Sequence, residues 1–175
     1  MNLPINHIGE KNWVKNLTIF LEDYDIIVER GELSTNLKLP KSMQEYYQNF
    51  GGIDSSDFMY NLYKINDLIL LVDSDFEFIK ENFSTELTKK FVVFSESPSN
   101  DPVCVNIIDE TIHIFSHDPI DSKKVFENFE QYLKYEIIEL QKLMGDVDFS
   151  KEEEIKYHKK HLNSNNIDYR YSKFC

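Results

Sequence analysis

The feature that most constrains the fold is a run of three apolar segments, residues 91–95, 103–108 and 111–116, separated only by short polar breaks. Each segment is rich in Val, Ile or Phe, a composition typical of β-strands. The break SESPSND carries turn-forming residues. Asp109 and Glu110 predict a two-residue hairpin turn, although the favoured glycine is missing. Together these segments predict a mostly antiparallel sheet.

Helical periodicity lies on both sides of this run. Apolar residues recur at helical spacing over residues 10–23 and 122–144, and Gly145 is a natural stop for the second of these helices. Shorter helices are predicted over residues 29–37 and 75–83. Further strands are predicted over residues 58–65 and 68–72, and the second of these segments could instead form a helix.

Beyond Gly145 the composition changes to alternating charge, which indicates a peripheral helix or a partly ordered tail supported by the pairs Glu152–Lys156 and Glu154–His158. We therefore expect an α+β domain over residues 1–145, followed by a charged helix or tail over 146–175. The domain has a mostly antiparallel sheet of about four to six strands, with N-terminal helices and a long C-terminal helix packed on it.

The best-marked helix lies within residues 39–52, LPKSMQEYYQNFGG. Pro40 suits the start of a helix, and Ser42 with Glu45 three residues later matches a capping box. Gly51 is the expected left-handed residue after the helix. Gly52 is expected to let the backbone pass close to a neighbouring element.

Side chains that could carry chemistry form only weak patterns. On one strand His113 and His117 would share a face but lie about 13 Å apart. His158 and His161 have a metal-compatible spacing, yet they lie in a lysine-rich segment typical of solvated surface. Cys104, within an apolar run, is typical of a buried thiol. The nucleotide-binding, nucleophile-elbow and zinc-protease motifs GxGxxG, GxxxxGK, GxSxG and HExxH do not occur. We expect no catalytic activity, cofactor or metal; an enzyme using His113, His117 and nearby acids is the weaker alternative.

The charge of the chain is explained either by solubility alone or by a cationic class of partner. The 31 acidic and 19 basic residues give a net charge of −12, and the whole excess falls within residues 1–145. Such a field repels nucleic acid and anionic lipid and favours a cationic partner. No apolar run is long enough to span a membrane, no signal peptide is visible, and two cysteines fit a reducing compartment, so we expect a cytoplasmic protein.

Residues 29–52, ERGELSTNLKLPKSMQEYYQNFGG, resemble the first motif of the SMI1/KNR4 family, also called the SUKH superfamily. The later order is similar to that family too: FVVFSES, DPVCVNI and TIHIFSHD precede the Phe-rich VFENFEQYL. The resemblance covers about residues 25–145 and depends on spacing and residue class rather than on a catalytic signature. Its fold-motif positions here are Leu39, Pro40, Phe50, Gly51 and Gly52.

The resemblance implies a non-catalytic protein-binding domain. Bacterial members are similar to immunity proteins that neutralise toxins, many of them nucleases, and fungal members are linked to regulation of cell-wall glucan synthesis. We expect either an immunity protein bound to a basic cognate toxin or a regulatory scaffold bound to endogenous proteins. Expected contact residues are exposed acids and one aromatic near the Gly-Gly pair and the strand loops: Asp54, Asp57, Tyr60, Glu96, Asp101 and Asp118.

Overall fold

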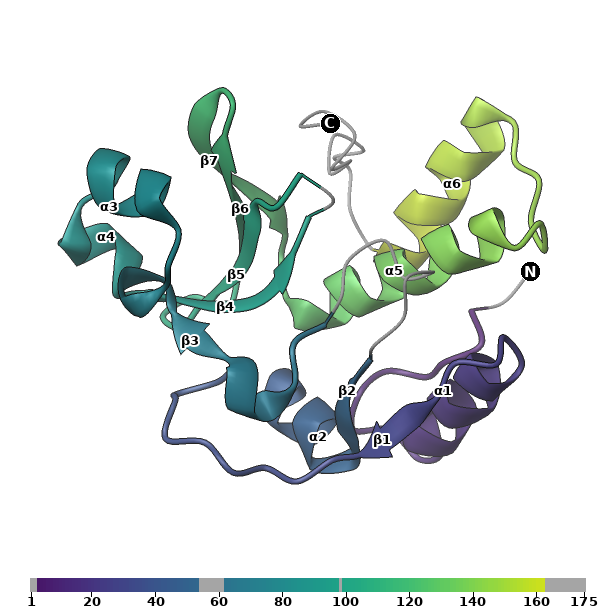
Figure 1. Ribbon diagram of the computed structural model, residues 1–175. Helices are drawn as coiled ribbons and strands as arrows, with labels where there is room; N and C mark the ends of the chain where they lie inside the picture. The colour runs from purple at the N-terminus through teal and green to yellow at the C-terminus, as the bar shows by residue number, and fades with distance from the viewer. Residues whose placement is uncertain (1–2, 54–61, 98, 163–175) are drawn as a thin grey trace.

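The computed structural model describes residues 3–53, 62–97 and 99–162. Its central element is a five-stranded antiparallel sheet in which each strand pairs with the next one along the chain (Figure 1). The strands are β3 (Ile69–Leu70), β4 (Phe91–Glu96), β5 (Pro102–Asn106), β6 (Ile112–His117) and β7 (Ile120–Phe126). The expectation of an α+β fold with a mostly antiparallel sheet is confirmed.

Helices cover both faces of this sheet. The helix α5 (Phe129–Leu143) lies on one face, and α3 (Glu77–Asn82) and α4 (Thr85–Thr88) lie on the other (Figure 1). Along β4, Val92 and Phe94 join the large core with α5, whereas Phe91 and Val93 join a smaller core on the α3 side. Because both faces are covered, β4 and β5 read as continuous apolar runs rather than as alternating patterns.

The N-terminal part packs below the sheet and against α5. Its elements are α1 (Trp13–Glu22), β1 (Val28–Arg30), α2 (Lys41–Asn49) and β2 (Phe50–Ile53). The Phe50 ring lies 5.8 Å from that of Trp13, and the buried Tyr46 ring lies 5.4 Å from that of Phe129 on α5. These aromatic contacts join α1, α2 and α5 into one core.

Both ends of α2 differ from the prediction. Pro40 occupies the N-cap position and no side chain caps the helix, so Ser42 lies in the first turn instead of forming a capping box. Phe50 is extended and Gly51 continues into β2, so Gly51 is not a left-handed cap. The chain goes directly from the helix into a strand because β2 pairs with β1. A Cβ on Gly51 would lie 3.1 Å from the Arg30 carbonyl oxygen, so close approach explains this glycine.

A glycine that the sequence analysis did not single out makes the tightest contact. A Cβ on Gly31 would lie only 2.4 Å from the backbone nitrogen of Phe50 and 2.4 Å from the carbonyl oxygen of Tyr47. Real side chains cannot approach backbone this closely, so only glycine fits where the chain leaves β1. The Gly31 N–H also donates to the carbonyl of Asn49.

The long helix predicted over 122–144 is shorter, because its first part is strand β7. Residues 120–126 pair with β6 from His117 back to Ile112. Asn128 then caps α5, its side-chain oxygen accepting from the Gln131 N–H at 2.9 Å. Pairing with β6 explains the strand, because Val125 and Phe126 alone are compatible with both the helical and the strand spacing of apolar residues.

The charged segment after Gly145 contains α6 (Lys151–Leu162), which packs on α5. Tyr157, His158 and Leu162 are buried, so this helix is only partly solvated. Glu154 lies 3.7 Å from His158, as the spacing predicted. Among the described residues, no helix has the length and apolarity needed to cross a bilayer.

The remaining predictions differ in detail. Residues 31–37 are irregular rather than helical. The β5–β6 connection is a loop of residues 107–111 with Glu110 left-handed, not a two-residue turn. The strand expected over 58–65 lies mostly outside the described residues, and its last part enters the short helix η1 (Ile65–Asp67). The segment 68–72 divides into β3 and the short helix η2 (Leu71–Asp73).

Candidate partner-binding surface

One end of the sheet is organised around a buried carboxylate, Asp101, just before β5. Its Oδ1 accepts from the His117 backbone N–H at 3.0 Å and lies 2.6 Å from His117 Nδ1. Asp101 is 1% exposed, whereas the His117 side chain is 50% exposed. Ser97 closes the loop, because its N–H donates to the Asp101 carbonyl and its hydroxyl accepts from the Asp101 N–H. Asp101 therefore fixes the end of β6 and orients the imidazole.

The short helix α3 packs against this end of the sheet. The Phe78 ring lies 5.9 Å from the His117 ring and 6.2 Å from that of Phe76. Both phenyl rings are half-buried. Next to them, Ile120 at the start of β7 leaves 46% of its surface exposed. Apolar side chains thus reach the surface between α3 and the β6–β7 turn.

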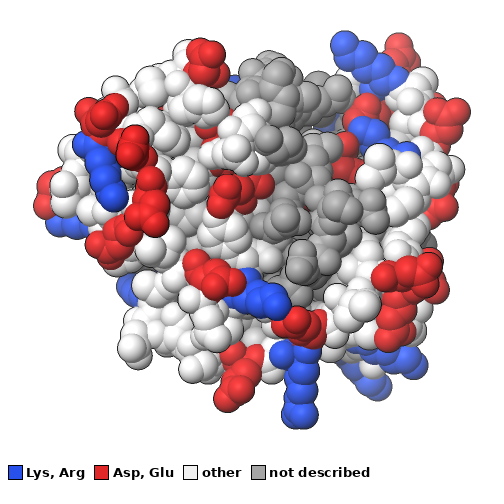
Figure 2. All heavy atoms as spheres, viewed as in Figure 1, with Lys and Arg blue, Asp and Glu red and all other residues white. Residues whose placement is uncertain are grey.

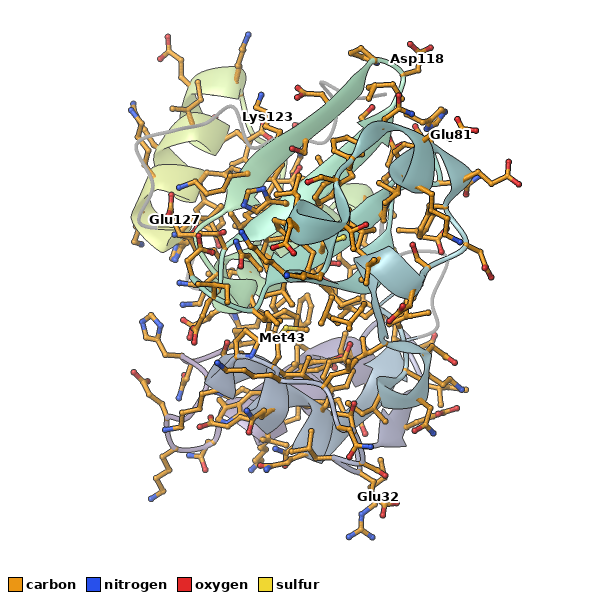
Figure 3. The ribbon with its side chains drawn as sticks, turned by 90° about the vertical axis from the view of Figure 1, so that its left-hand side faces the viewer. Glu32, Met43, Glu81, Asp118, Lys123 and Glu127 are labelled. Atoms are coloured by element: carbon orange, nitrogen blue, oxygen red, sulfur yellow. The ribbon has the colours of Figure 1, made fainter. Side chains whose placement is uncertain are left out.

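Carboxylates surround these apolar groups. We define the acidic surface as the exposed acids of η2, of α3 and their connection, of the β6–β7 turn and of the start of β7: Asp73, Asp75, Glu77, Glu81, Asp118 and Asp121. Figure 2 shows acidic side chains gathered over the α3–α4 side, and Figure 3 shows Glu81 and Asp118 at the same corner of the molecule. The acids of η2 and α3 lie near those at the β6–β7 turn because Phe78 of α3 contacts His117 beside the turn.

The six carboxylates of the acidic surface form no close ion pairs with described residues. In the described part of the chain, none of the six forms an ion pair. By contrast, Glu86 lies 2.5 Å from Lys89 and Glu127 lies 2.8 Å from Lys124. The acidic surface therefore combines six exposed carboxylates with the half-buried or exposed apolar side chains of Phe76, Phe78 and Ile120.

The predicted contact residues have different positions. Asp118 is exposed within the acidic surface, and Glu96 is half-buried and accepts a hydrogen bond from the Tyr63 hydroxyl. Burial raises the pKa of Glu96. Asp101 was expected to be exposed, and this is wrong because its carboxylate is buried and bonds to the backbone N–H and the imidazole of His117. The strand register brings these three acids to one end of the sheet.

The other three predicted contact residues, Asp54, Asp57 and Tyr60, lie outside the described residues. The acids of η2 and α3 were not predicted. Their only signal was the acid-rich stretch from Asp73 to Glu77, which overlaps the helix predicted over residues 75–83.

Cys104 and His113 are directly opposite each other on β5 and β6. Burial raises the pKa of the Cys104 thiol well above its usual range and lowers that of the His113 imidazole. Both shifts favour the neutral groups, the reverse of the thiolate–imidazolium pair that nucleophilic cysteines use. The His113 ring packs 5.0 Å from that of Phe91, as a core histidine would.

Three potential metal ligands, Glu139, Glu154 and His158, converge between α5 and α6. The Lys142 ammonium lies 3.0 Å from a Glu139 oxygen and 2.9 Å from a Glu154 oxygen. These two carboxylates raise the pKa of Lys142 against the opposing effect of burial. A cation already stands between them, so this cluster works as an ion-pair network that fastens α6 to α5.

Comparison with known families identifies the fold. The model of the SMI1/KNR4 family (SUKH-1) matches residues 28–135, from the start of β1 into α5, which is more than half of the chain. Searches of curated proteins and of solved structures find no match. The matched range holds the acidic surface and the Asp101–His117 contact, and domains of this family are generally non-catalytic and bind partner proteins. The chain therefore belongs to the SMI1/KNR4 (SUKH-1) family.

Proposed function

We propose that this chain is a cytoplasmic immunity protein that binds a cognate toxin and blocks its action without catalysis. The observation that carries the proposal is the acidic surface, whose six carboxylates have no cationic partner among the described residues. Keeping so many like charges together costs stability, and a basic partner offsets that cost.

A toxin that acts on nucleic acid fits such a surface. A nuclease must present cationic groups to phosphate, and an acidic protein competes for the same groups. Complementary charge speeds association. Ile120 and Phe78 supply apolar surface that is buried when the complex forms.

The proposal is tested by co-expressing the chain with a toxin domain taken from a gene adjacent to its own. We expect the cells to survive and the two proteins to form a complex at low salt. If the toxin still kills, or no complex forms, the immunity function is wrong. Binding to an endogenous protein in place of the toxin would favour the alternative, a regulatory scaffold.

The position of the interface is tested separately with charge reversals. The double variant Glu81→Lys/Asp118→Lys alters the acidic surface, and the matched variant Glu86→Lys/Glu127→Lys reverses two exposed acids that have lysine partners. We expect only the first variant to lose protection. Equal protection by both variants would place the interface elsewhere.

A further inference from the structure

A second candidate site lies where α6 packs on α5, on the side of the molecule away from α3 and α4 (Figure 1). Three side chains that can bind a metal converge there: Glu139 from α5, and Glu154 and His158 from α6. One ligand atom of each lies within 4.8 Å of the other two. All three residues come after residue 135, so this site lies outside the part of the chain that matches the family model.

The sequence of α6 places two of these ligands on one helical face. Glu154 and His158 are four residues apart, so their side chains project from neighbouring turns on the same side of the helix. That side is turned toward α5, because the His158 ring lies 5.5 Å from the Tyr135 ring. The Gln131 side chain of α5 also donates to the Leu162 carbonyl at the end of α6. The contact between the helices therefore fixes the direction in which both ligands point.

The separations of the three ligand atoms suit one small ion. His158 Nε2 lies 3.7 Å from Glu154 Oε1 and 4.0 Å from Glu139 Oε1, and both distances are too long for a hydrogen bond. Ligand atoms bound at about 2.1 Å to a tetrahedral zinc ion lie about 3.4 Å from one another. Small side-chain shifts therefore bring the imidazole to the spacing that zinc requires with each carboxylate.

The ligands are largely shielded from water. His158 is 8% exposed, and the side chains of Glu139 and Glu154 are each 12% exposed. Carboxylates placed so close together in such surroundings are costly unless a cation lies between them. The burial of this cluster thus favours occupation by a positively charged group.

Lys142 provides that positive charge in the metal-free chain. Its ammonium lies 3.0 Å from Glu139 Oε1 and 2.9 Å from Glu154 Oε1, the same two oxygens that face His158. Lys142 belongs to the last turn of α5, and its side chain is 31% exposed. It can therefore move into solvent when another cation enters. A divalent ion then supplies two positive charges where the ammonium supplied one.

We propose that Glu139, Glu154 and His158 bind one zinc ion, which displaces the Lys142 ammonium and joins α6 to α5. Two carboxylate oxygens and an imidazole nitrogen are ligands typical of zinc, and they leave the fourth position to water, whereas magnesium and calcium take oxygen ligands. This proposal departs from the expectation of no metal drawn from the sequence. Its test needs no toxin, so its failure and that of the proposed function are separate results.

The first test is isothermal titration calorimetry of the chelator-treated chain with zinc chloride. We expect one zinc ion to bind per chain and magnesium chloride to give no comparable heat. His158→Gln should weaken zinc binding at least about tenfold, because it removes a ligand. His161→Gln, three residues further along α6, is the matched control and should leave the affinity unchanged. Absence of zinc binding would overturn the proposal, and so would equal affinity of these two variants, which would show an adventitious ion only.

A second pair of variants tests the displacement of the ammonium. Lys142→Met should bind zinc about threefold to tenfold more tightly than the wild type, because zinc no longer has to break two ion pairs. Lys159→Met removes the same charge at an exposed position of α6 and should not change the affinity. An affinity of Lys142→Met equal to or weaker than that of the wild type would overturn the displacement.

A measurement on the wild type keeps the proposal testable if a variant fails to fold. In the ¹⁵N-labelled chain, added zinc should shift the ring Nε2 resonance of His158 and leave the rings of His113 and His117 unchanged. Shifts at His7 or His117 without a shift at His158 would overturn the proposed ligand set.

Discussion

The buried carboxylate of Glu136 gives the strongest prediction about stability. Glu136 is 1% exposed on α5, and neither carboxylate oxygen has a hydrogen-bond partner among the described residues. Burial, and secondarily the charge of Glu139, raises its pKa well above the ordinary value of 4.5. The folded chain therefore keeps the Glu136 proton at pH values where the unfolded chain has released it.

The sign and size of the effect follow from proton linkage. As the pH rises above 4.5, the unfolded state binds fewer protons than the folded state, so this residue lowers the free energy of unfolding. The loss amounts to about 1.4 kcal/mol for each pH unit until the folded group also ionises. Glu136→Gln has no proton to lose, so its stability relative to the wild type rises with pH at this slope.

Urea denaturation, followed by far-UV circular dichroism at about pH 5, 6 and 7, measures the difference. The comparison variant is Glu32→Gln, which removes one charge at an exposed position. Glutamine adds its own unsatisfied amide, but that cost does not change with pH. If the free energies of the Glu136→Gln variant and the wild type change in parallel over this range, Glu136 is not a neutral buried acid.

Three further substitutions test the fold by chemical denaturation. Gly31→Ala places a Cβ against the backbone of α2 and β2, so its free energy of unfolding should fall by about 1–3 kcal/mol or more. A variant as stable as the wild type would contradict the close approach. Glu110→Gly removes the strain of a left-handed glutamate (φ 66°), so its free energy of unfolding should rise by about 0.5–1 kcal/mol. A decrease would show that the contacts of the Glu110 side chain stabilise the fold by more than the backbone strain costs. Asp101→Ala removes the carboxylate that accepts from the His117 backbone N–H, so the free energy of unfolding should fall by about 1–3 kcal/mol. An unchanged denaturation midpoint would show that this contact does not stabilise the end of β6.

The sheet was predictable because its signals are local. The runs that became β4, β5 and β6 are apolar and separated by short polar breaks, so their antiparallel order follows from the sequence. Strand β7 was not predictable, because residues 121–124 are polar and none of them is buried, and only pairing with β6 makes them a strand. Gly31 was missed for the same reason, since nothing near it in the sequence shows that Phe50 and Tyr47 pass so close.

The candidate surface was predictable only in part. The prediction placed acids at the strand loops, and Asp118 lies in the acidic surface. It failed for Asp101, because a buried acid in a loop and an exposed one have the same sequence signature, and only the partner His117 distinguishes them. The contribution of α3 depends on Phe78 packing against His117, a contact between residues far apart in the sequence.

The central claim, that the acidic surface recruits a basic toxin, is tested most directly by the salt dependence of the association rate constant. Stopped-flow mixing of the purified chain with a toxin domain taken from a gene adjacent to its own gives this rate over a range of sodium chloride concentrations. The rate should fall steeply with salt for the wild type. For Glu81→Lys/Asp118→Lys it should be about tenfold lower at low salt and should fall less steeply with salt. Equal rates and equal salt dependence for the wild type and this variant would contradict the claim.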